Sequence, residues 1–528
     1  MTAPRSLALS LALLAPHAAA QCPVAKFRAS DAAPGDELGN PVALSGDVLA
    51  AGAWLVDTSA ADSGAVYVFR RGPGGWAEEA KILGPEVQNA NFGIALDADG
   101  ELLLVGARRD EPGGRGVAYV YGRRAGAWSE EARWLAPSGQ TSDQFGLAVA
   151  LAGSTAVVGA AREETAGARH GAAYVFQRSP TGWSLAARLV ASDAEDLDLF
   201  GAAVAIDGDR VLVGAHRADA PDPSSGAVYV FDRSGAVWTE TAILTPGAPA
   251  AQDQFGFDVS VDGDRALVGA NFDDTVAGNA GAAYLFERAG GSWSQVQKLT
   301  DPSGSIGDEF GRSVAIEGDR ALVGEPYDTV AELRSGSAYV FARGATEWTQ
   351  TSKLSDPAGA RNDNFAWTVD LDGGLAAAGV PVDDDLGTET GSAFLFTASA
   401  LVGTSYCTAL PSSTGSPARL CAGGSASVAA NDLYLAASPV PDQPGIFFYG
   451  RSPIEIPFGD GRLCAGGGIF RLGRPSSRRA ESSRGRSTTA RRPPTRVPER
   501  SPPARRGTSR PGSAIPPRAR RASTRPTG

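Results

Sequence analysis

Acidic residues recur at a fixed place in this chain of 528 residues. Seven segments each carry a carboxylate four or five positions after a recurring glycine, and these carboxylates are Asp57, Asp110, Glu164, Asp219, Asp273, Asp328 and Asp383. Five further aspartates stand two residues before a recurring phenylalanine: Asp143, Asp198, Asp253, Asp308 and Asp363. Carboxylates can attract cationic or polar partners, coordinate hard cations or, as a pair, hydrolyse a glycosidic bond.

Other side chains that support catalysis are scarce. After residue 20 the only histidines are His170 and His216, which argues against a histidine metal cluster and a Ser-His-Asp triad. A lone histidine in an acidic loop, such as His216, is more simply explained as a solvated side chain. The chain has no phosphate-binding glycine loop and no Ser-x-Asp-x-Gly-x-x-Trp box. We therefore expect no catalysis, no cofactor and no metal site.

The acids belong to a repeat. Phenylalanine recurs at positions 92, 145, 200, 255, 310 and 365, and tryptophan recurs at positions 76, 128, 183, 238, 293 and 348. A weaker first copy begins at Leu38, which gives seven copies. A fixed period of this length indicates a repeat architecture, and no copy shows a sustained apolar period of 3.6 residues.

Each copy predicts four short strands. In the copy that starts at Phe200 they are 203–206, 210–213, 227–231 and 238–244. Asp207-Gly208-Asp209 suits a tight hairpin turn between the first two, because Asp-Gly tolerates positive φ. The loop between the second and third strands is long and rich in Pro, Ser and Asp. Four antiparallel strands repeated seven times predict a β-propeller.

The seventh copy lacks a fourth strand, and the N-terminal segment can supply it. Residues 24–31 match residues 187–193, and both segments lie the same distance before the next copy. Pairing 24–31 with the seventh copy closes the ring and leaves no long sheet edge exposed. The predicted fold is all-β, a seven-bladed propeller of four-stranded blades over residues 21–397, and we expect a monomer.

Alternating strand direction sorts the connections of each blade onto two faces. The connections between strands 2 and 3, and those between blades, share a face with long loops and the twelve acids. The tight hairpins share the other face, with an arginine after the third strand at Arg70, Arg123, Arg178, Arg233, Arg288 and Arg343. Any single loop acid is more simply explained as a turn cap. The long-loop face as a whole favours binding, because recognition residues tend to lie on loops held by a rigid scaffold.

The Phe-Gly and Val-Gly-Ala units, such as Phe200-Gly201 and Val213-Gly214-Ala215, resemble FG-GAP repeats over residues 24–397. These are the units of the integrin α-subunit propeller, and the closer similarity is to secreted bacterial FG-GAP proteins. In integrin-type repeats a calcium loop of Asp-x-Asp-x-Asp-Gly character often joins the first two strands. Here that connection is a short turn such as Asp207-Gly208-Asp209, which cannot place six or more oxygens around one ion. The calcium sites are therefore not expected.

The N-terminal residues 1–20 predict a secretory signal peptide, with Arg5 before an apolar run and Ala18-Ala19-Ala20 at the cleavage site. No later stretch is apolar for 18 residues, so no membrane span is expected. An exported chain permits disulfides, and the candidates, which allow three pairings, are Cys22, Cys407, Cys421 and Cys464.

Two further regions follow the repeats. Residues 398–473 predict a small cysteine-containing β-module, and residues 474–528 an Arg-, Pro- and Ser-rich disordered tail. From Arg471 onward there are 17 arginines and two glutamates, so this segment carries +15 and leaves −26 on the rest of a chain whose net charge is −11. Out-of-frame translation of a GC-rich gene explains the same composition. The tail has no interleaved aromatic residues, and we expect no nucleic-acid partner.

These features predict a secreted or cell-surface protein that binds an extracellular protein or glycan ligand through an acidic loop face, without catalysis. One alternative is a secreted polysaccharide hydrolase that uses paired loop carboxylates. A second alternative is a structural component of the cell envelope, whose ring only displays the C-terminal module.

Overall fold

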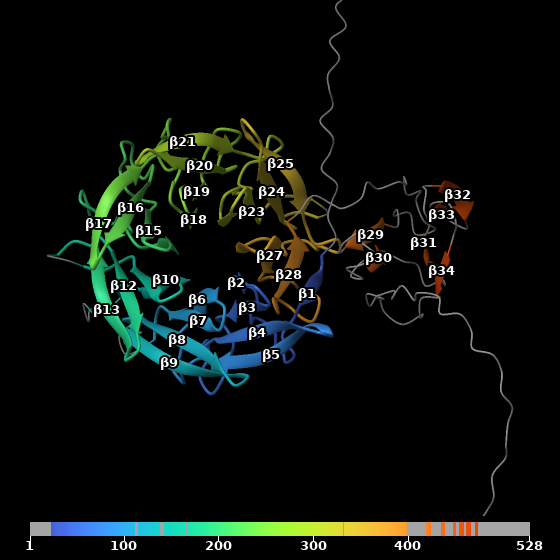
Figure 1. Cartoon of the computed structure of the whole chain (residues 1–528), viewed down its shortest axis with the longest axis horizontal. Coiled ribbons are helices and arrows are strands. Elements are labelled where there is room, and N and C mark those ends of the chain that lie inside the picture. Colours follow the sequence, from blue (N-terminus) through green and yellow to red (C-terminus); the bar gives the residue numbers. More distant parts are fainter. Residues whose placement is uncertain are drawn as a thin grey trace, which may run out of the picture. The chain divides into compact units, whose positions relative to one another are not determined.

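The computed structural model describes residues 23–110, 114–137, 142–164, 167–330 and 332–398, together with six short strands after residue 398. Seven four-stranded antiparallel sheets surround an axis, and the first strand of each sheet lies nearest to it (Figure 1). The predicted seven-bladed propeller is therefore confirmed. No helix in the part of the chain that the structure describes has the length and apolar character needed to span a membrane.

The first four blades follow one another along the chain. Blade 1 consists of β2 (Val42–Ser45), β3 (Val48–Ala53), β4 (Ala65–Gly72) and β5 (Gly75–Leu83). Blade 2 consists of β6 (Phe92–Asp99), β7 (Leu102–Ala107), β8 (Val117–Arg124) and β9 (Ala127–Leu135). Blade 3 consists of β10 (Phe145–Ala152), β11 (Thr155–Ala160), β12 (Ala172–Ser179) and β13 (Gly182–Leu189). Blade 4 consists of β14 (Ala203–Asp207), β15 (Arg210–Ala215), β16 (Ala227–Ser234) and β17 (Val237–Leu244).

The remaining blades complete the ring. Blade 5 consists of β18 (Val259–Asp262), β19 (Arg265–Ala270), β20 (Ala282–Ala289) and β21 (Ser292–Leu299). Blade 6 consists of β22 (Val314–Glu317), β23 (Arg320–Glu325), β24 (Ser337–Arg343) and β25 (Trp348–Leu354). Blade 7 consists of β26 (Val369–Asp372), β27 (Leu375–Val380), β28 (Ser392–Thr397) and the N-terminal β1 (Ala25–Phe27).

After residue 398 the structure describes three antiparallel pairs. They are formed by β29 (Arg419–Gly423) with β30 (Tyr434–Ser438), β31 (Phe447–Tyr449) with β34 (Phe470–Gly473), and β32 (Ile454–Phe458) with β33 (Gly461–Ala465). The predicted signal peptide, Cys22, Cys407, the side chains of Cys421 and Cys464, and the tail 474–528 lie outside the described residues.

The N-terminal strand closes the ring as the sequence predicted. Ala25, Lys26 and Phe27 pair in register with Leu395, Phe394 and Ala393 of β28. Phe27 is buried, and its ring lies 4.9 Å from the ring of Phe69 and 5.6 Å from that of Trp76, centre to centre. The closure therefore joins blade 7 to the core of blade 1 as well as completing a sheet.

The recurring phenylalanine and glycines explain how neighbouring blades pack. Phe200 is fully buried, and its ring lies 5.4 Å from the ring of Tyr229 and 6.1 Å from that of Phe231. Gly171, the residue before β12 of blade 3, forms a bridge to Phe200 at the start of blade 4. It has φ of +85°, and a Cβ there would lie 2.1 Å from the Phe200 carbonyl oxygen. Only glycine permits this conformation together with so close a backbone approach.

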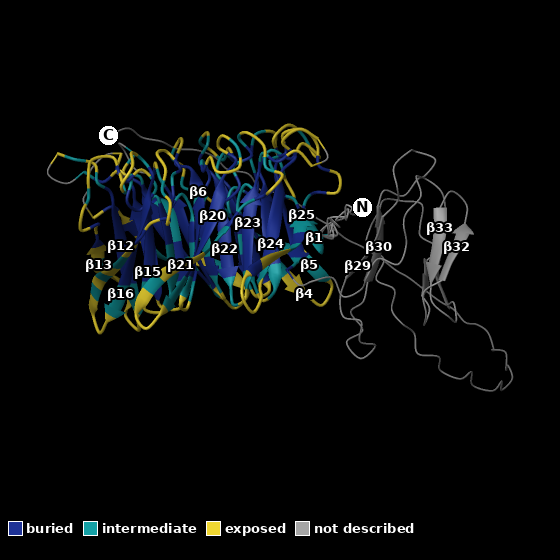
Figure 2. Ribbon diagram, turned by 90° about the horizontal axis from the view of Figure 1, so that it is seen from above, coloured by how far each residue is buried: buried dark blue, intermediate teal, exposed yellow. Residues whose placement is uncertain are grey.

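Buried residues fill the sheets, and exposed residues gather at the two ends of the ring (Figure 2). One end, the long-loop face, carries the loops between strands 2 and 3 and the connections between blades. The other end, the hairpin face, carries the tight 1–2 and 3–4 turns.

Candidate functional site

The seven predicted loop acids fall into two classes, set by their distance from the glycine of the second strand. Those four residues after it are buried, with exposed fractions between 0% and 8%: Asp110, Asp273, Asp328 and Asp383. Those five residues after it reach the surface: Asp57 and Asp219 are exposed, and Glu164 is half-buried. A difference of one residue in spacing thus decides whether the carboxylate faces the interior or solvent.

Each buried acid binds side chains of its own blade. In blade 5, Tyr284 donates a hydrogen bond to Asp273 at 2.6 Å, and Lys298 Nζ lies 2.6 Å from the same carboxylate oxygen. Tyr284 and Lys298 face each other on β20 and β21, with Nζ 5.1 Å from the centre of the phenol ring. Burial alone raises the pKa of Asp273, but the hydrogen bonds from Lys298 and Tyr284 outweigh it and hold that pKa below its usual value.

This contact between an acid, a tyrosine and a cation recurs around the ring. Blade 2 uses Asp110, Tyr119 and Arg133, and blade 3 uses Glu163, Tyr174 and Arg188. The buried acid of blade 3 is therefore Glu163, the residue beside the predicted Glu164. In blade 7, Phe394 replaces the tyrosine and Lys26 of the closing strand contacts Asp383 at 2.5 Å.

Blades 1 and 4 take the acid from a different loop. Their residues four positions after the glycine are apolar and buried, namely Val56 and Ala218. The acid comes instead from the segment that precedes the blade: Tyr67 donates to Asp31 at 2.8 Å, and Tyr229 donates to Asp193 at 2.7 Å. The match between residues 24–31 and 187–193 contained both aspartates, but the sequence did not reveal the tyrosine contact.

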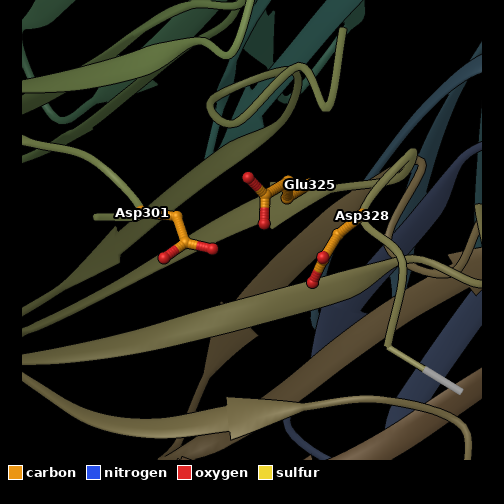
Figure 3. Close-up of side chains that lie close together, drawn as sticks. All are labelled: Asp301, Glu325 and Asp328. Carbon is orange, nitrogen blue, oxygen red and sulfur yellow. The ribbon is translucent and has the colours of Figure 1, made fainter. Parts of the chain in front are cut away.

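Blade 6 brings three carboxylates together, those of Asp301, Glu325 and Asp328, with one oxygen of each within 4.8 Å of the others (Figure 3). The Tyr339 hydroxyl oxygen lies 2.6 Å from Asp301 and 2.7 Å from Glu325, and Lys353 Nζ lies 2.6 Å from Asp328. Burial, followed by the charge of Asp328, raises the pKa of Glu325 to about 9. At neutral pH a proton on Glu325 and the ammonium group of Lys353 therefore balance much of the negative charge.

The exposed acids and the acids between blades hold turns. Asp57 accepts the backbone N–H of Asp62 at 3.0 Å, and Asp219 accepts that of Ser224 at 2.7 Å. Of the acids two residues before the phenylalanine, all five are buried, and four accept the backbone N–H three residues earlier: Asp198, Asp253, Asp308 and Asp363. Burial raises the pKa of Asp253 and of Asp363 to about 6.

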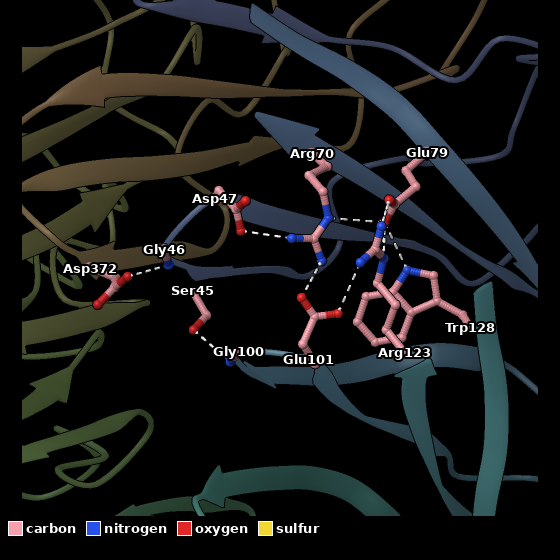
Figure 4. A network of polar contacts seen from close by, with 10 residues as sticks. All are labelled: Ser45, Gly46, Asp47, Arg70, Glu79, Gly100, Glu101, Arg123, Trp128 and Asp372. Atoms are coloured by element: carbon pink, nitrogen blue, oxygen red, sulfur yellow. Dashed lines mark hydrogen bonds and ion pairs between the residues drawn. The ribbon is translucent and has the colours of Figure 1, made fainter. Parts of the chain in front are cut away.

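The arginines of the hairpin face bind carboxylates of neighbouring blades. Arg70 of blade 1 contacts Asp47 and Glu79 of its own blade and Glu101 of blade 2 (Figure 4). Arg123 of blade 2 contacts Glu101 and reaches back to Glu79 at 2.5 Å. The same step to the preceding blade joins Arg178 to Glu131, Arg233 to Gln177, Arg288 to Asp232 and Arg343 to Glu287.

In six of the seven blades the residue that ends the first strand also joins two blades. Asp372 of blade 7 accepts the backbone N–H of Gly46, the turn glycine of blade 1, at 2.5 Å (Figure 4). Equivalent contacts run from Ser45 to Gly100, Asp99 to Gly153, Asp207 to Gly263, Asp262 to Gly318 and Glu317 to Gly373. Between blades 3 and 4 the equivalent residue is Ala152, which has no acceptor. We call these contacts the inter-blade latches.

Sequence reasoning missed the residues where the long-loop face meets the propeller axis. His216 is half-buried against Phe257, with ring centres 5.4 Å apart, which corrects the expectation of a solvated side chain. Burial, followed by the charge of Arg217, lowers the pKa of His216 to about 4. Across the next blades, Arg312 lies over the rings of Phe257 and Trp367, 5.4 Å and 3.7 Å from their centres.

One signal in the sequence marks these axial positions. They are the second residue after each recurring phenylalanine and the residues just after each second strand, and they differ from copy to copy where their neighbours recur.

Comparison with known proteins agrees with this architecture. The FG-GAP repeat family matches residues 23–69, 76–121, 128–176, 183–231, 238–286, 293–341 and 348–396. Each match begins near the fourth strand of one blade and ends in the third strand of the next, so the family unit spans the contact between two blades. No curated protein matches the chain. The seven matches cover more than half of its residues, and the chain therefore belongs to the FG-GAP repeat family.

Proposed function

We propose that the protein is exported and binds an extracellular protein or glycan through its long-loop face, as a monomer and without catalysis. FG-GAP repeats commonly bind ligands. The observation that carries the proposal is the combination of fixed loop bases and exposed loop tips on this face. Buried acids hold the bases to tyrosines and cations of the sheets, whereas the tips present Asp57, Asp219 and large apolar side chains.

The apolar side chains support a protein or glycan partner. Ile306 is 83% exposed and Leu386 is 56% exposed, and both lie on long loops. Leu197, Val276, Val330 and Leu333 are also exposed there. Apolar residues at the tips of well-anchored loops suit recognition, because little conformational entropy is lost when a partner binds. On the hairpin face the arginines after the third strands are already bound to acids or to an amide oxygen.

The proposal is tested by probing glycan and protein arrays with the purified protein, followed by paired variants. Asp57→Asn, Glu164→Gln and Asp219→Asn together remove three charges from the long-loop face while keeping an oxygen acceptor at each site. We expect weaker binding of the captured ligand and a smaller dependence on salt concentration. The control, Asp209→Asn, Asp264→Asn and Asp319→Asn, removes the same charge from the hairpin face and should leave binding unchanged.

Two outcomes contradict the proposal. If the hairpin-face variant abolishes binding while the long-loop variant binds normally, the recognition surface has been assigned to the wrong face. If the protein releases reducing ends from a polysaccharide and Asp253→Asn stops the release, the hydrolase with paired loop carboxylates replaces the binding protein.

A further inference from the structure

Arginines without a carboxylate partner follow the second strands of blades 2 to 4, at the axial end of the long-loop face. They are the residues one or two positions after the second strand: Arg108, Arg109, Arg162 and Arg217. Among the described residues, none of their guanidinium groups forms an ion pair or a hydrogen bond. The arginines after each third strand on the hairpin face, by contrast, all contact acids or an amide oxygen.

Arg108 is the best placed of the four to receive a ligand. Its guanidinium carbon lies 5.6 Å from the centre of the Trp54 ring in the neighbouring blade. Its Nε atom is buried and donates to no acceptor among the described residues. Burial, followed by the charges of Arg109 and Arg162, lowers the pKa of Arg108, which is the effect expected of like charges held close together. A buried donor without an acceptor is costly, and an anionic ligand would remove that cost.

In blades 5 to 7 the residues at the same end of the ring are aromatic, and the arginine among them is paired with an acid. Arg312 lies between Phe257 and Trp367, and its charge is paired with Glu309 at 2.7 Å. Tyr327 meets the Trp367 ring edge-on, with centres 6.0 Å apart. Unpaired guanidinium groups therefore follow the second strands of blades 2 to 4, whereas aromatic rings gather at the same end of blades 5 to 7.

We propose that Arg108, Arg109 and Arg162, with the ring of Trp54 beside Arg108, bind the carboxylate or sulfate group of an acidic sugar. Arginine forks bind such oxyanions through two parallel hydrogen bonds, and aromatic rings pack against the apolar faces of sugar rings. Exposed acids on the surrounding loop tips, such as Asp57 and Asp219, repel a long uniformly charged chain. The site therefore suits a terminal or isolated acidic sugar unit. This inference names a ligand class for the long-loop face and rests on the proposed function, but it uses residues separate from the loop-tip acids.

The test is calorimetric titration of the full chain with three trisaccharides that end in glucuronic acid, in a sulfated sugar or in neutral glucose. The test variant carries Arg108→Gln, Arg109→Gln and Arg162→Gln. Its matched control carries Arg71→Gln, Arg115→Gln and Arg361→Gln, which are exposed arginines without a carboxylate partner among the described residues. The arginine-rich tail is present in every protein compared, so its contribution cancels. Unchanged melting temperatures show that both variants are folded.

We expect the parent and the control to bind at least one acidic trisaccharide about tenfold or more tightly than the neutral one, and the test variant to lose about tenfold or more in affinity. Arg108→Lys keeps the charge but not the fork and should lose part of that affinity. Equal loss in test and control variants, or equal binding of the neutral sugar, overturns the inference. The inference is also overturned if the parent binds DNA or heparin more tightly than the acidic trisaccharides and the test variant binds them as tightly as the parent does. The variant with Asp57→Asn, Glu164→Gln and Asp219→Asn separates the two proposals. If the inference is overturned while this variant still binds an array ligand more weakly than the parent does, the axial site fails and the proposed function stands.

Discussion

The two ends of the ring contain the same kinds of side chain but connect them differently. On the hairpin face, Arg123 reaches Glu79 of the preceding blade and Asp372 reaches Gly46 of the following one, so the polar contacts run around the ring. On the long-loop face, Asp273 binds Tyr284 and Lys298 of its own blade, so the polar contacts fix a loop to its sheet. One end holds the blades together, and the other holds each loop base in place and leaves the tips free to differ.

The closing strand contributes to both patterns, and its removal should have the largest effect. Deleting residues 21–31 removes β1, its pairing with β28, the buried ring of Phe27 and the ammonium group of Lys26 beside Asp383 and Asp356. We expect the free energy of unfolding to fall by about 5 kcal/mol or more, since a buried phenylalanine and a broken buried ion pair each cost about 3–5 kcal/mol. Thermal unfolding measures the loss. Deleting residues 474–528 is the control, and an equal effect of the two deletions would contradict the assigned closure.

The contacts within a blade are tested by Lys298→Met. This change leaves the buried carboxylate of Asp273 without its cation, and we expect a loss of about 3 kcal/mol in denaturant titration. Ile243 occupies the equivalent position in blade 4, where no cation is present. Ile243→Met should therefore be nearly neutral. Similar losses in the two variants would show that the lysine acts only through packing.

Glu325 provides a test by pH. A carboxyl group whose pKa is raised in the folded protein contributes stability that is fully present below the unfolded pKa and is lost as the pH rises toward the folded value. Glu325→Gln removes this dependence, so its stability relative to the parent should increase with pH up to about pH 9, by at most about 1.4 kcal/mol per unit.

Asp273→Asn tests a carboxyl group on the same face whose pKa is shifted in the opposite direction. Because its pKa is lowered, the contribution of Asp273 to stability is present at neutral pH and is lost in acid.

Parallel pH profiles of stability for Glu325→Gln and its parent would contradict the prediction for Glu325, because they would show that Glu325 titrates normally.

The inter-blade latches should have the smallest effects. Asp372→Ala removes a charged acceptor from the N–H of Gly46 and should cost about 1–2 kcal/mol. The reverse change is available where the latch is missing: Ala152→Asp places an acceptor opposite the turn of blade 4 and should add about 0.5 kcal/mol. If Ala152→Asp destabilises the protein as much as Asp372→Ala, the latch geometry does not extend to this interface.

The features that the sequence revealed are those that every blade needs. The phenylalanine, the strand-2 glycine and the match between residues 24–31 and 187–193 recur because each interface between blades has the same shape. The role of individual acids was harder to predict, because Glu163 and Glu164 are adjacent and only their direction on the loop separates a buried contact from a half-buried one. The change from Asp273 in blade 5 to Asp193 in blade 4 moves the same acid to another loop, which spacing along the chain cannot show. The axial arginines were missed because they lie at positions that differ between copies.

The pairing of β1 with β28 also determines how the ring is attached to the rest of the chain. Ala25 lies opposite Leu395, and Ala398 donates its N–H to Gly374 in the 1–2 turn of blade 7. The polypeptide therefore enters and leaves the propeller side by side on the hairpin face. A group attached to the chain directly beside Ala25 or Ala398 therefore lies at the hairpin face, on the side of the ring opposite the long loops.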